Sequence, residues 1–301
     1  MSSCFSVHID VDSPLVLADF YNKDASHYTL EQLEKFYEQT FERACTLFEQ
    51  YGVQGTFFCV ASEISRSPKI KEAVQKALDR GHHLGHHTLT HPFGLNEMNP
   101  VQRAAEIESA NKIFQESFGF IPQGFRTPGY AVDTEVINLL KKNGIKYDSS
   151  AAWPIFHVIF KWMRSRKKEQ SGMKVGYGET NSGFISNPYS PADKNWKEKS
   201  GSMDFMEYPL PSSFFILPCY GNLHLYFPPF FTKLLLIFTR RHKHLIYLMH
   251  SIEFASIEDE FIPEEILVHP HVSKPNVWKQ RKIEAVLKFL SRNREHKVIE
   301  E

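Results

Sequence analysis

The chain has 301 residues, 42% of them hydrophobic, which is enough to bury the core of one large domain or two smaller ones. Its 35 basic and 35 acidic residues give zero formal charge, which argues against a nucleic-acid-binding protein, since that class usually carries a basic field. Four scattered cysteines predict neither a disulfide framework nor a zinc knuckle. The N-terminal segment lacks a basic stretch followed by an apolar one, and no apolar run is long enough to cross a bilayer. We therefore expect a cytoplasmic protein without a transmembrane segment.

Strand-like and helical segments alternate along the first half of the chain. Strands are expected at residues 4–11, 53–60, 82–85, 124–126 and 145–148, and helices at 29–51, 67–78, 99–118 and 133–142. Thr29 and Gln32 form a capping-box pattern at the start of the first helix, and Gly52 ends it. The alternation predicts an α/β fold with a parallel sheet or a distorted (β/α) barrel. In such folds the working residues gather where strands end.

The second half is less regular. Residues 154–211 are rich in Gly, Ser, Asn and Pro after a basic run at 161–168, and we expect an insertion or lid within a single catalytic domain over 1–301. The basic run is then a solvated face or a contact for phosphate or anionic lipid. A strand at 245–250 and a helix at 276–291 complete the pattern.

The most apolar segment, residues 226–238, contains prolines and a lysine and is too short to span a bilayer. A buried element is the expected structure, and contact with a membrane surface or a lipid tail is the alternative. The overlapping aromatic stretch, 214–231, is expected either to pack in the core or to line a sugar or lipid pocket.

Two histidines four residues apart, His87 and His91, are the strongest chemical signal. On a helix or a tight turn this spacing lets both rings reach one metal ion. Asp10 and Asp12 end the first strand, where residues two apart share a face. Asp12 with the two histidines makes three ligands and leaves a coordination position open, while Asp10 remains as a base. Chance pairing in a histidine-rich stretch, and capping roles for the aspartates, are the alternatives.

Three further segments carry groups of catalytic type. Arg126 precedes a turn whose Gly129 or Tyr130 N–H can face a developing oxyanion, and an arginine beside a carboxylate fixes its charge and rotamer. A salt bridge and a plain turn are the alternative. His250 ends a strand and can protonate a leaving amine if a carboxylate holds its tautomer. Asp148 and Glu253 are the candidates for that carboxylate, and a core histidine is the alternative.

Taken together, these motifs resemble the polysaccharide deacetylase family, also called the NodB-homology domain or carbohydrate esterase family 4. Asp10-Val11-Asp12, His87-Thr88-Leu89-Thr90-His91, Arg126-Thr127-Pro128-Gly129-Tyr130 and Leu248-Met249-His250 follow the family order over residues 5–255. Several pieces are most similar to a cytoplasmic branch with peptidoglycan-deacetylase-like and allantoinase-like members. The fourth motif, around Asp148, is blurred, and the segment from His250 to Glu253 lacks the Pro-Trp usual in that branch.

The resemblance implies N-deacetylation of an acetamido sugar, a glycan or a lipid-linked sugar. It implies Zn²⁺ held by Asp12, His87 and His91, with Asp10, Arg126, His250 and Asp148 as catalytic residues and Gly129, Tyr130 and Glu253 at the substrate. Nitrogen and oxygen ligands also suit Co²⁺, Ni²⁺ or Fe²⁺. Allantoinase-like hydrolysis of a cyclic imide and an inactive metal-binding interaction module are the alternatives. A homo-oligomer, and a peripheral position at the inner membrane face, remain open.

Overall fold

The structure is a computed structural model that describes residues 3–152, 187–199, 201–213, 217–218, 225 and 227–299. The basic run at 161–168 and most of the aromatic stretch 214–231 lie outside the described residues. The same holds for residues 154–186 of the expected insertion.

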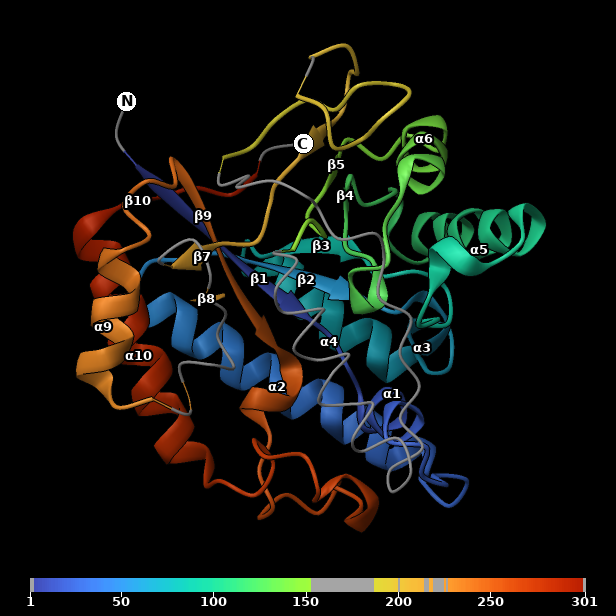
Figure 1. Cartoon of the computed structure of the whole chain (residues 1–301). Helices are drawn as coiled ribbons and strands as arrows, with labels where there is room; N and C mark the ends of the chain where they lie inside the picture. The colour runs from blue at the N-terminus through green and yellow to red at the C-terminus, as the bar shows by residue number, and fades with distance from the viewer. Residues whose placement is uncertain are drawn as a thin grey trace.

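A curled parallel sheet forms the centre of the molecule, with β1 (Cys4–Asp10) near one end of the strand order (Figure 1). β9 (His244–His250) pairs with β1 along its whole length, and β2 (Gly55–Cys59) pairs with the last residues of β1. From β2 the sheet continues through β3 (His83–His86), β4 (Gly124–Phe125), β5 (Tyr147–Asp148) and β6 (Met206–Glu207). β10 (Glu295–His296) joins the start of β1, and β7 (Ser212–Ser213) and β8 (Leu217–Pro218) form a separate antiparallel pair. The predicted distorted (β/α) barrel is confirmed.

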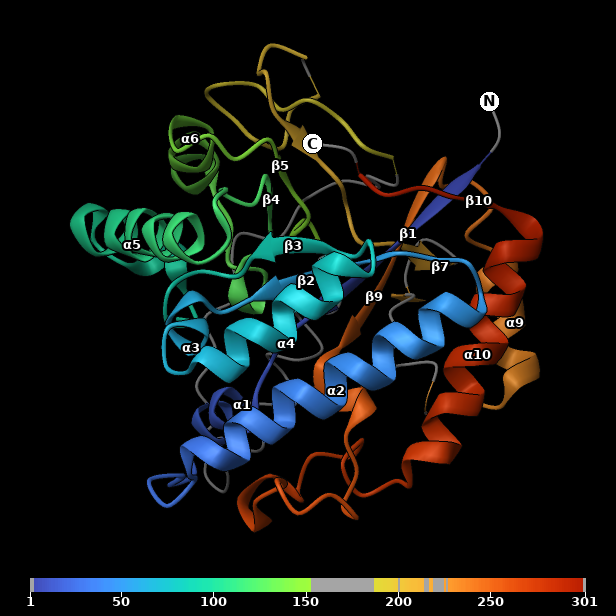
Figure 2. The ribbon, with the colours of Figure 1, turned by 180° about the vertical axis from the view of Figure 1, so that it is seen from behind.

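Helices cover the outside of the sheet, and Figure 2 shows α2 and α4 lying across it. The α-helices are α1 (Pro14–Phe20), α2 (Leu30–Gln50), α3 (Ala61–Ile64), α4 (Pro68–Asp79), α5 (Pro100–Phe118), α6 (Thr134–Lys142), α9 (Pro229–Ile237) and α10 (Asn276–Asn293). The capping box of Thr29 and Gln32 is present at the start of α2, and Asn99 and Asp133 cap α5 and α6. Local chemistry therefore sets these helix starts, as the sequence predicts. The short α1 and α3, and the two-residue β10, were not expected.

Successive side chains of β1 and β9 point to opposite faces of the sheet, so that one face packs in the core and the other faces the site. Phe5, Val7 and Ile9 are buried in a cluster that extends to the covering helices. His8 and Asp10 lie on the opposite face of β1, since side chains two apart share a face. On β9, Leu248 and His250 follow the same parity, and Asp10 is the register partner of His250. The sheet thus has an apolar outer face and an inner face that carries polar groups toward the strand ends.

A small inner cluster shows how far the sheet curls. It brings Phe58 of β2, Tyr147 of β5, Leu210, and Ile246 and Leu248 of β9 into one buried group. These residues are far apart in strand order, so the sheet must bend back on itself to join them. The interior is therefore filled by side chains in the manner of a small barrel.

The segments expected to be an insertion and a buried apolar element differ in detail from their prediction. Met206 and Glu207 fall within the expected insertion 154–211, yet they form β6 and pair with β5. The apolar segment 226–238 forms α9, with Leu235 and Leu236 buried and Phe230 exposed. Cys4, Cys45 and Cys59 are free thiols. Among the described residues, no helix combines the length and the apolar character needed to cross a membrane.

We predict that Gly85→Ala destabilises the fold by about 1–3 kcal/mol, the usual cost of overpacking a core. A Cβ on Gly85 in β3 would lie 2.4 Å from the Phe58 ring, which packs inside the barrel. Urea unfolding measures the change. The double variant Gly85→Ala/Phe58→Leu should recover part of the loss because the smaller side chain leaves room. Equal stability of Gly85→Ala and the wild type would contradict the packing argument.

Candidate metal and hydrolytic centre

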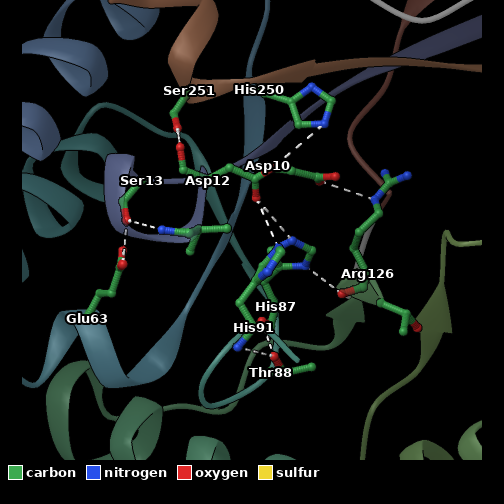
Figure 3. Close-up of polar contacts among 12 residues, drawn as sticks. Asp10, Asp12, Ser13, Glu63, His87, Thr88, His91, Arg126, His250 and Ser251 are labelled. Atoms are coloured by element: carbon green, nitrogen blue, oxygen red, sulfur yellow. Dashed lines mark hydrogen bonds and ion pairs between the residues drawn. The ribbon is translucent and has the colours of Figure 1, made fainter. Parts of the chain in front are cut away.

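The residues singled out in the sequence meet where the parallel strands end (Figure 3). Asp10 and His250 are the last residues of β1 and β9, and His87 and Arg126 directly follow β3 and β4. Asp148 ends β5. Parallel strands deliver their carboxyl ends to one edge, so residues far apart in sequence share one site.

Asp12, His87 and His91 lie close enough to hold one metal ion, with one ligand atom from each within 4.8 Å of the others. The Nε2 atoms of His87 and His91 lie 3.6 and 3.2 Å from Asp12 Oδ1. Ligands about 2.0–2.1 Å from a tetrahedral Zn²⁺ would be about 3.3–3.4 Å apart, so the spacing fits such an ion. Two imidazoles and a carboxylate also match the donor set of catalytic metal sites, which keep a position open.

The ring of His87 is fixed in the orientation that a metal ligand needs. Its Nδ1–H donates to the Arg126 carbonyl at 2.6 Å, which leaves Nε2 with its lone pair toward Asp12. A backbone carbonyl in this role sets both the tautomer and the ring orientation of a ligating histidine. Burial opposes ionisation of Asp12, but the neighbouring rings of His87 and His91 hold its pKa well below the ordinary value.

The turn between the two histidines is strained and tightly held. Thr88 and His91 have φ values of 67° and 61°, a region that non-glycine residues rarely occupy. The Thr88 hydroxyl donates to the His87 carbonyl at 2.6 Å and accepts from the His91 N–H at 3.0 Å. The buried Glu106 of α5 accepts from the N–H groups of Leu89 and Thr90 at 3.0 and 2.9 Å. It also accepts from the Thr90 hydroxyl at 2.7 Å.

Arg126 is fully buried, and its side chain contacts both Asp10 and His8 of β1. Its Nε lies 3.3 Å from Asp10 Oδ1, and a terminal nitrogen donates to His8 Nδ1 at 2.7 Å. Its guanidinium also lies 5.1 Å from the centre of the Phe58 ring. Burial and the neighbouring Arg126 hold the pKa of His8 well below its ordinary value, so His8 accepts as a neutral ring. The Asp10 side chain is thus held in a fixed orientation beside the candidate metal ligands.

Asp148 lies behind Arg126 and away from His250. Its Oδ1 accepts from the Ser150 hydroxyl at 2.7 Å, and the Ser150 oxygen accepts from the Thr127 N–H at 2.8 Å. Its partner carboxyl is Glu207 of β6, which is fully buried and accepts from the Ala151 N–H at 2.9 Å. Burial raises the pKa of Glu207 well above its ordinary value, and Asp148 raises it further. Burial therefore favours the protonated form of Glu207 beside Asp148.

His250 faces the metal ligands from the other side of Asp12. Its Nε2 lies 3.9 Å from Asp12 Oδ2, and its Nδ1 lies 3.5 Å from Glu253 Oε1. Burial lowers the pKa of His250, but Glu253, Asp12 and Asp10 together raise it to about 9. Of the two carboxylates considered for this histidine, Glu253 is the one beside it. Glu253 is 1% exposed, so it orients His250 from within the core.

The turn after Arg126 distinguishes the two candidate oxyanion donors. Gly129 and Tyr130 both have positive φ, at 62° and 59°. The Tyr130 N–H donates to the Thr127 carbonyl at 2.9 Å, so this donor is already used within the turn. That arrangement favours Gly129 as the donor.

Sequence patterns did not reveal several residues that support the site. Glu106 lies on a helix where an acidic residue ordinarily faces water, and Glu207 lies in a segment without periodicity. Glu63 is buried and accepts from the Ser13 hydroxyl at 2.5 Å and from Tyr37 at 2.7 Å, next to Asp12. His8 had a detectable signal, because it shares the strand face of Asp10.

Residues 25–147, from α2 to β5, match the family model described as polysaccharide deacetylase. The matched segment is less than half of the chain. A peptidoglycan-N-acetylglucosamine deacetylase of Bacillus cereus is 30% identical over 98 residues, 33% of this chain and 44% of that protein. A chitooligosaccharide deacetylase of Azorhizobium caulinodans is 30% identical over 104 residues, 34% of this chain and 47% of that protein. The chain therefore matches less than half the length of either relative.

Solved structures share the fold of this chain. A candidate polysaccharide deacetylase from Mycobacterium smegmatis superposes with a TM-score of 0.58 at 16% identity, covering 97% of this chain and 84% of its own. A family 4 carbohydrate esterase from Streptomyces lividans gives 0.51 at 10% identity, covering 99% and 93%. At these identities the matches establish the barrel fold alone.

We predict that Glu106→Gln weakens Zn²⁺ binding by about 10- to 100-fold, the usual effect of removing a group that supports metal ligands. The amide loses the charge that holds the N–H groups of Leu89 and Thr90. Isothermal titration calorimetry with Zn²⁺ measures the affinity. Glu108→Gln, at an exposed position of the same helix, is the matched control and should bind as the wild type does. Equal affinity of both variants would reject the supporting role.

We predict that Glu207→Gln changes how stability depends on pH. The ordinary pKa of a glutamate is 4.5. In the folded protein Glu207 keeps its proton at pH values above this, whereas in the unfolded chain it ionises. The folded state then binds more protons at this group, so the contribution of Glu207 to wild-type stability falls as pH rises above about 4, by up to about 1.4 kcal/mol per pH unit. The glutamine variant lacks this loss and should gain on the wild type as pH rises.

Urea unfolding of both proteins from pH 4 to pH 7 checks this expectation. Glu260→Gln, at an exposed position, is the control and should follow the wild-type curve. Parallel curves for Glu207→Gln and the wild type would show that Glu207 does not hold a proton in the folded state.

Proposed function

We propose that this protein is a metal-dependent amide hydrolase that removes the acetyl group from an acetamido sugar. One observation carries the proposal. Asp12, His87 and His91 gather around one point, with Asp10 beside them on one side and His250 on the other. A binding module needs the ligands alone, whereas a hydrolase needs a base and an acid as well.

The three ligands would hold a divalent metal, Zn²⁺ by the nature of the donors, which when bound polarises the acetyl carbonyl and acidifies water. Asp10 accepts a proton from the attacking water, and Arg126 keeps Asp10 oriented. The N–H of Gly129 would donate to the developing oxyanion. His250 donates a proton to the departing amine, with Glu253 holding its ring.

The substrate class rests on the chemistry that the relatives' names describe. One is named for deacetylation of peptidoglycan N-acetylglucosamine and the other for deacetylation of chitooligosaccharides. Both names describe loss of acetate from an acetamido group on a sugar. We propose the same class here, with a glycan or a lipid-linked sugar as the carrier.

We predict that Asp10→Asn keeps the metal but lowers turnover by about 10²- to 10⁴-fold, because it removes the base and leaves the ligands in place. His91→Ala should lose both metal and activity, because only two ligands remain. Acetate release from chitooligosaccharides measures turnover, and elemental analysis measures bound metal. Asp193→Asn is the control for Asp10→Asn, since Asp193 is exposed and outside the site.

The outcomes separate the rival functions. Ring opening of a ureide without acetate release would favour an allantoinase-like hydrolase. Full metal content without turnover on either substrate class would favour an interaction module. Wild-type turnover in Asp10→Asn would reject the base assignment, and unchanged metal in His91→Ala would reject the ligand assignment.

A further inference from the structure

The helix α9 presents large apolar side chains on two opposite sides. Leu235 and Leu236 are buried in the main core. Phe230, Leu234 and Phe238 are 71%, 40% and 41% exposed. These three are spaced four apart, so they lie along one stripe of the helix and point away from the core. An exposed stripe of this kind on a folded domain indicates a surface that another apolar phase covers.

The helix α9, which carries the exposed stripe, packs firmly on the rest of the protein. α9 packs beside α10 at the outer edge of the molecule, as both views show (Figures 1 and 2). Lys282 of α10 donates to the carbonyls of Leu225 and Phe227 at 2.7 and 3.0 Å, just before α9 begins. The same ammonium lies 4.0 Å from the centre of the Trp278 ring, which is 38% exposed. Trp278 therefore extends the stripe from α9 onto α10.

The charges around the stripe are mostly positive. Between Glu207 and Glu253 the sequence has no acidic residue, while it has four basic ones. Three of these, Lys233, Arg240 and Lys243, are exposed on α9 or just beyond it. On the neighbouring α10 the exposed cations are Arg281, Lys288 and Arg292, against one acidic residue, Glu284. The net charge of the chain is zero, yet positive charge is concentrated around these exposed apolar side chains.

We propose that the surface formed by Phe230, Leu234, Phe238 and Trp278, with Lys233 and Arg240, docks on an anionic lipid bilayer. Large apolar side chains that enter the interface, flanked by cations that meet phosphate headgroups, are the features of a membrane-surface helix. A second copy of the chain fits less well. A two-fold interface places the same patch on both partners, so these cations would face their own copies. This inference stands apart from the proposed hydrolase activity, because none of these residues belongs to the site.

The test is co-sedimentation with vesicles of phosphatidylcholine alone and of phosphatidylcholine with about one third phosphatidylglycerol. The wild type should bind the anionic vesicles and release them in about 1 M salt, where charge is screened within about 3 Å. Leu234→Gln/Phe238→Gln should reduce binding at least about tenfold, because it removes the apolar stripe. Lys233→Gln/Arg240→Gln should reduce it by about fivefold for each charge at low salt.

Matched controls lie on the far side of the molecule. Val101→Gln changes a residue of α5 that is 79% exposed, and Lys71→Gln/Lys112→Gln removes two exposed charges from α4 and α5. Both should bind as the wild type does. Circular dichroism and acetate release from a soluble oligosaccharide should be unchanged in the α9 variants, so a membrane defect is distinguished from a catalytic or folding defect.

Two results would overturn the proposal. One is a wild type that does not bind the anionic vesicles, or α9 variants that bind as well as the controls. The other is a wild-type dimer in sedimentation velocity that Leu234→Gln/Phe238→Gln converts to a monomer, since the stripe would then be an interface between copies.

Discussion

The buried charge of Arg126 is the constraint around which the candidate site is organised. A guanidinium with no exposure to water is costly unless its donors find partners, and the cost is of the order of several kcal/mol. Asp10 and His8 on β1 meet two of its nitrogens, and its own carbonyl accepts from His87. One residue thereby joins the proposed base to a proposed metal ligand. Displacing it would disturb both at once.

The carboxyl groups of Asp148 and Glu207 lie near Arg126 and also affect the charge around it. Burial and the neighbouring Asp148 hold the pKa of Glu207 well above its ordinary value, which favours a neutral Glu207 and lessens the negative charge near the guanidinium. Glu207 comes from β6, which makes the far edge of the sheet part of the support for groups on β1 and β4.

Much of the fold is visible in local patterns, since capping residues and apolar periodicity depend only on neighbours in the chain. Thr29, Asn99 and Asp133 start their helices as expected, and Asp12, His87 and His91 meet as their motif predicts. Glu106 and Glu207 could not be found in this way. Each is an acidic residue whose burial depends on a partner brought by another element. The exposed side of α9 was likewise hidden, because apolar residues on both sides of a helix give no periodic signal.

The strained turn between His87 and His91 bears on how the site is assembled. Thr88 and His91 occupy left-handed backbone conformations that the Thr88 hydroxyl and the Glu106 carboxylate stabilise. Contacts within the chain therefore set the separation of the two imidazoles before any ion arrives. Uptake of the proposed metal would then need little ordering of the backbone, unlike in zinc fingers, where the ion drives folding. A chelator that removed such an ion would leave the barrel folded and able to bind metal again.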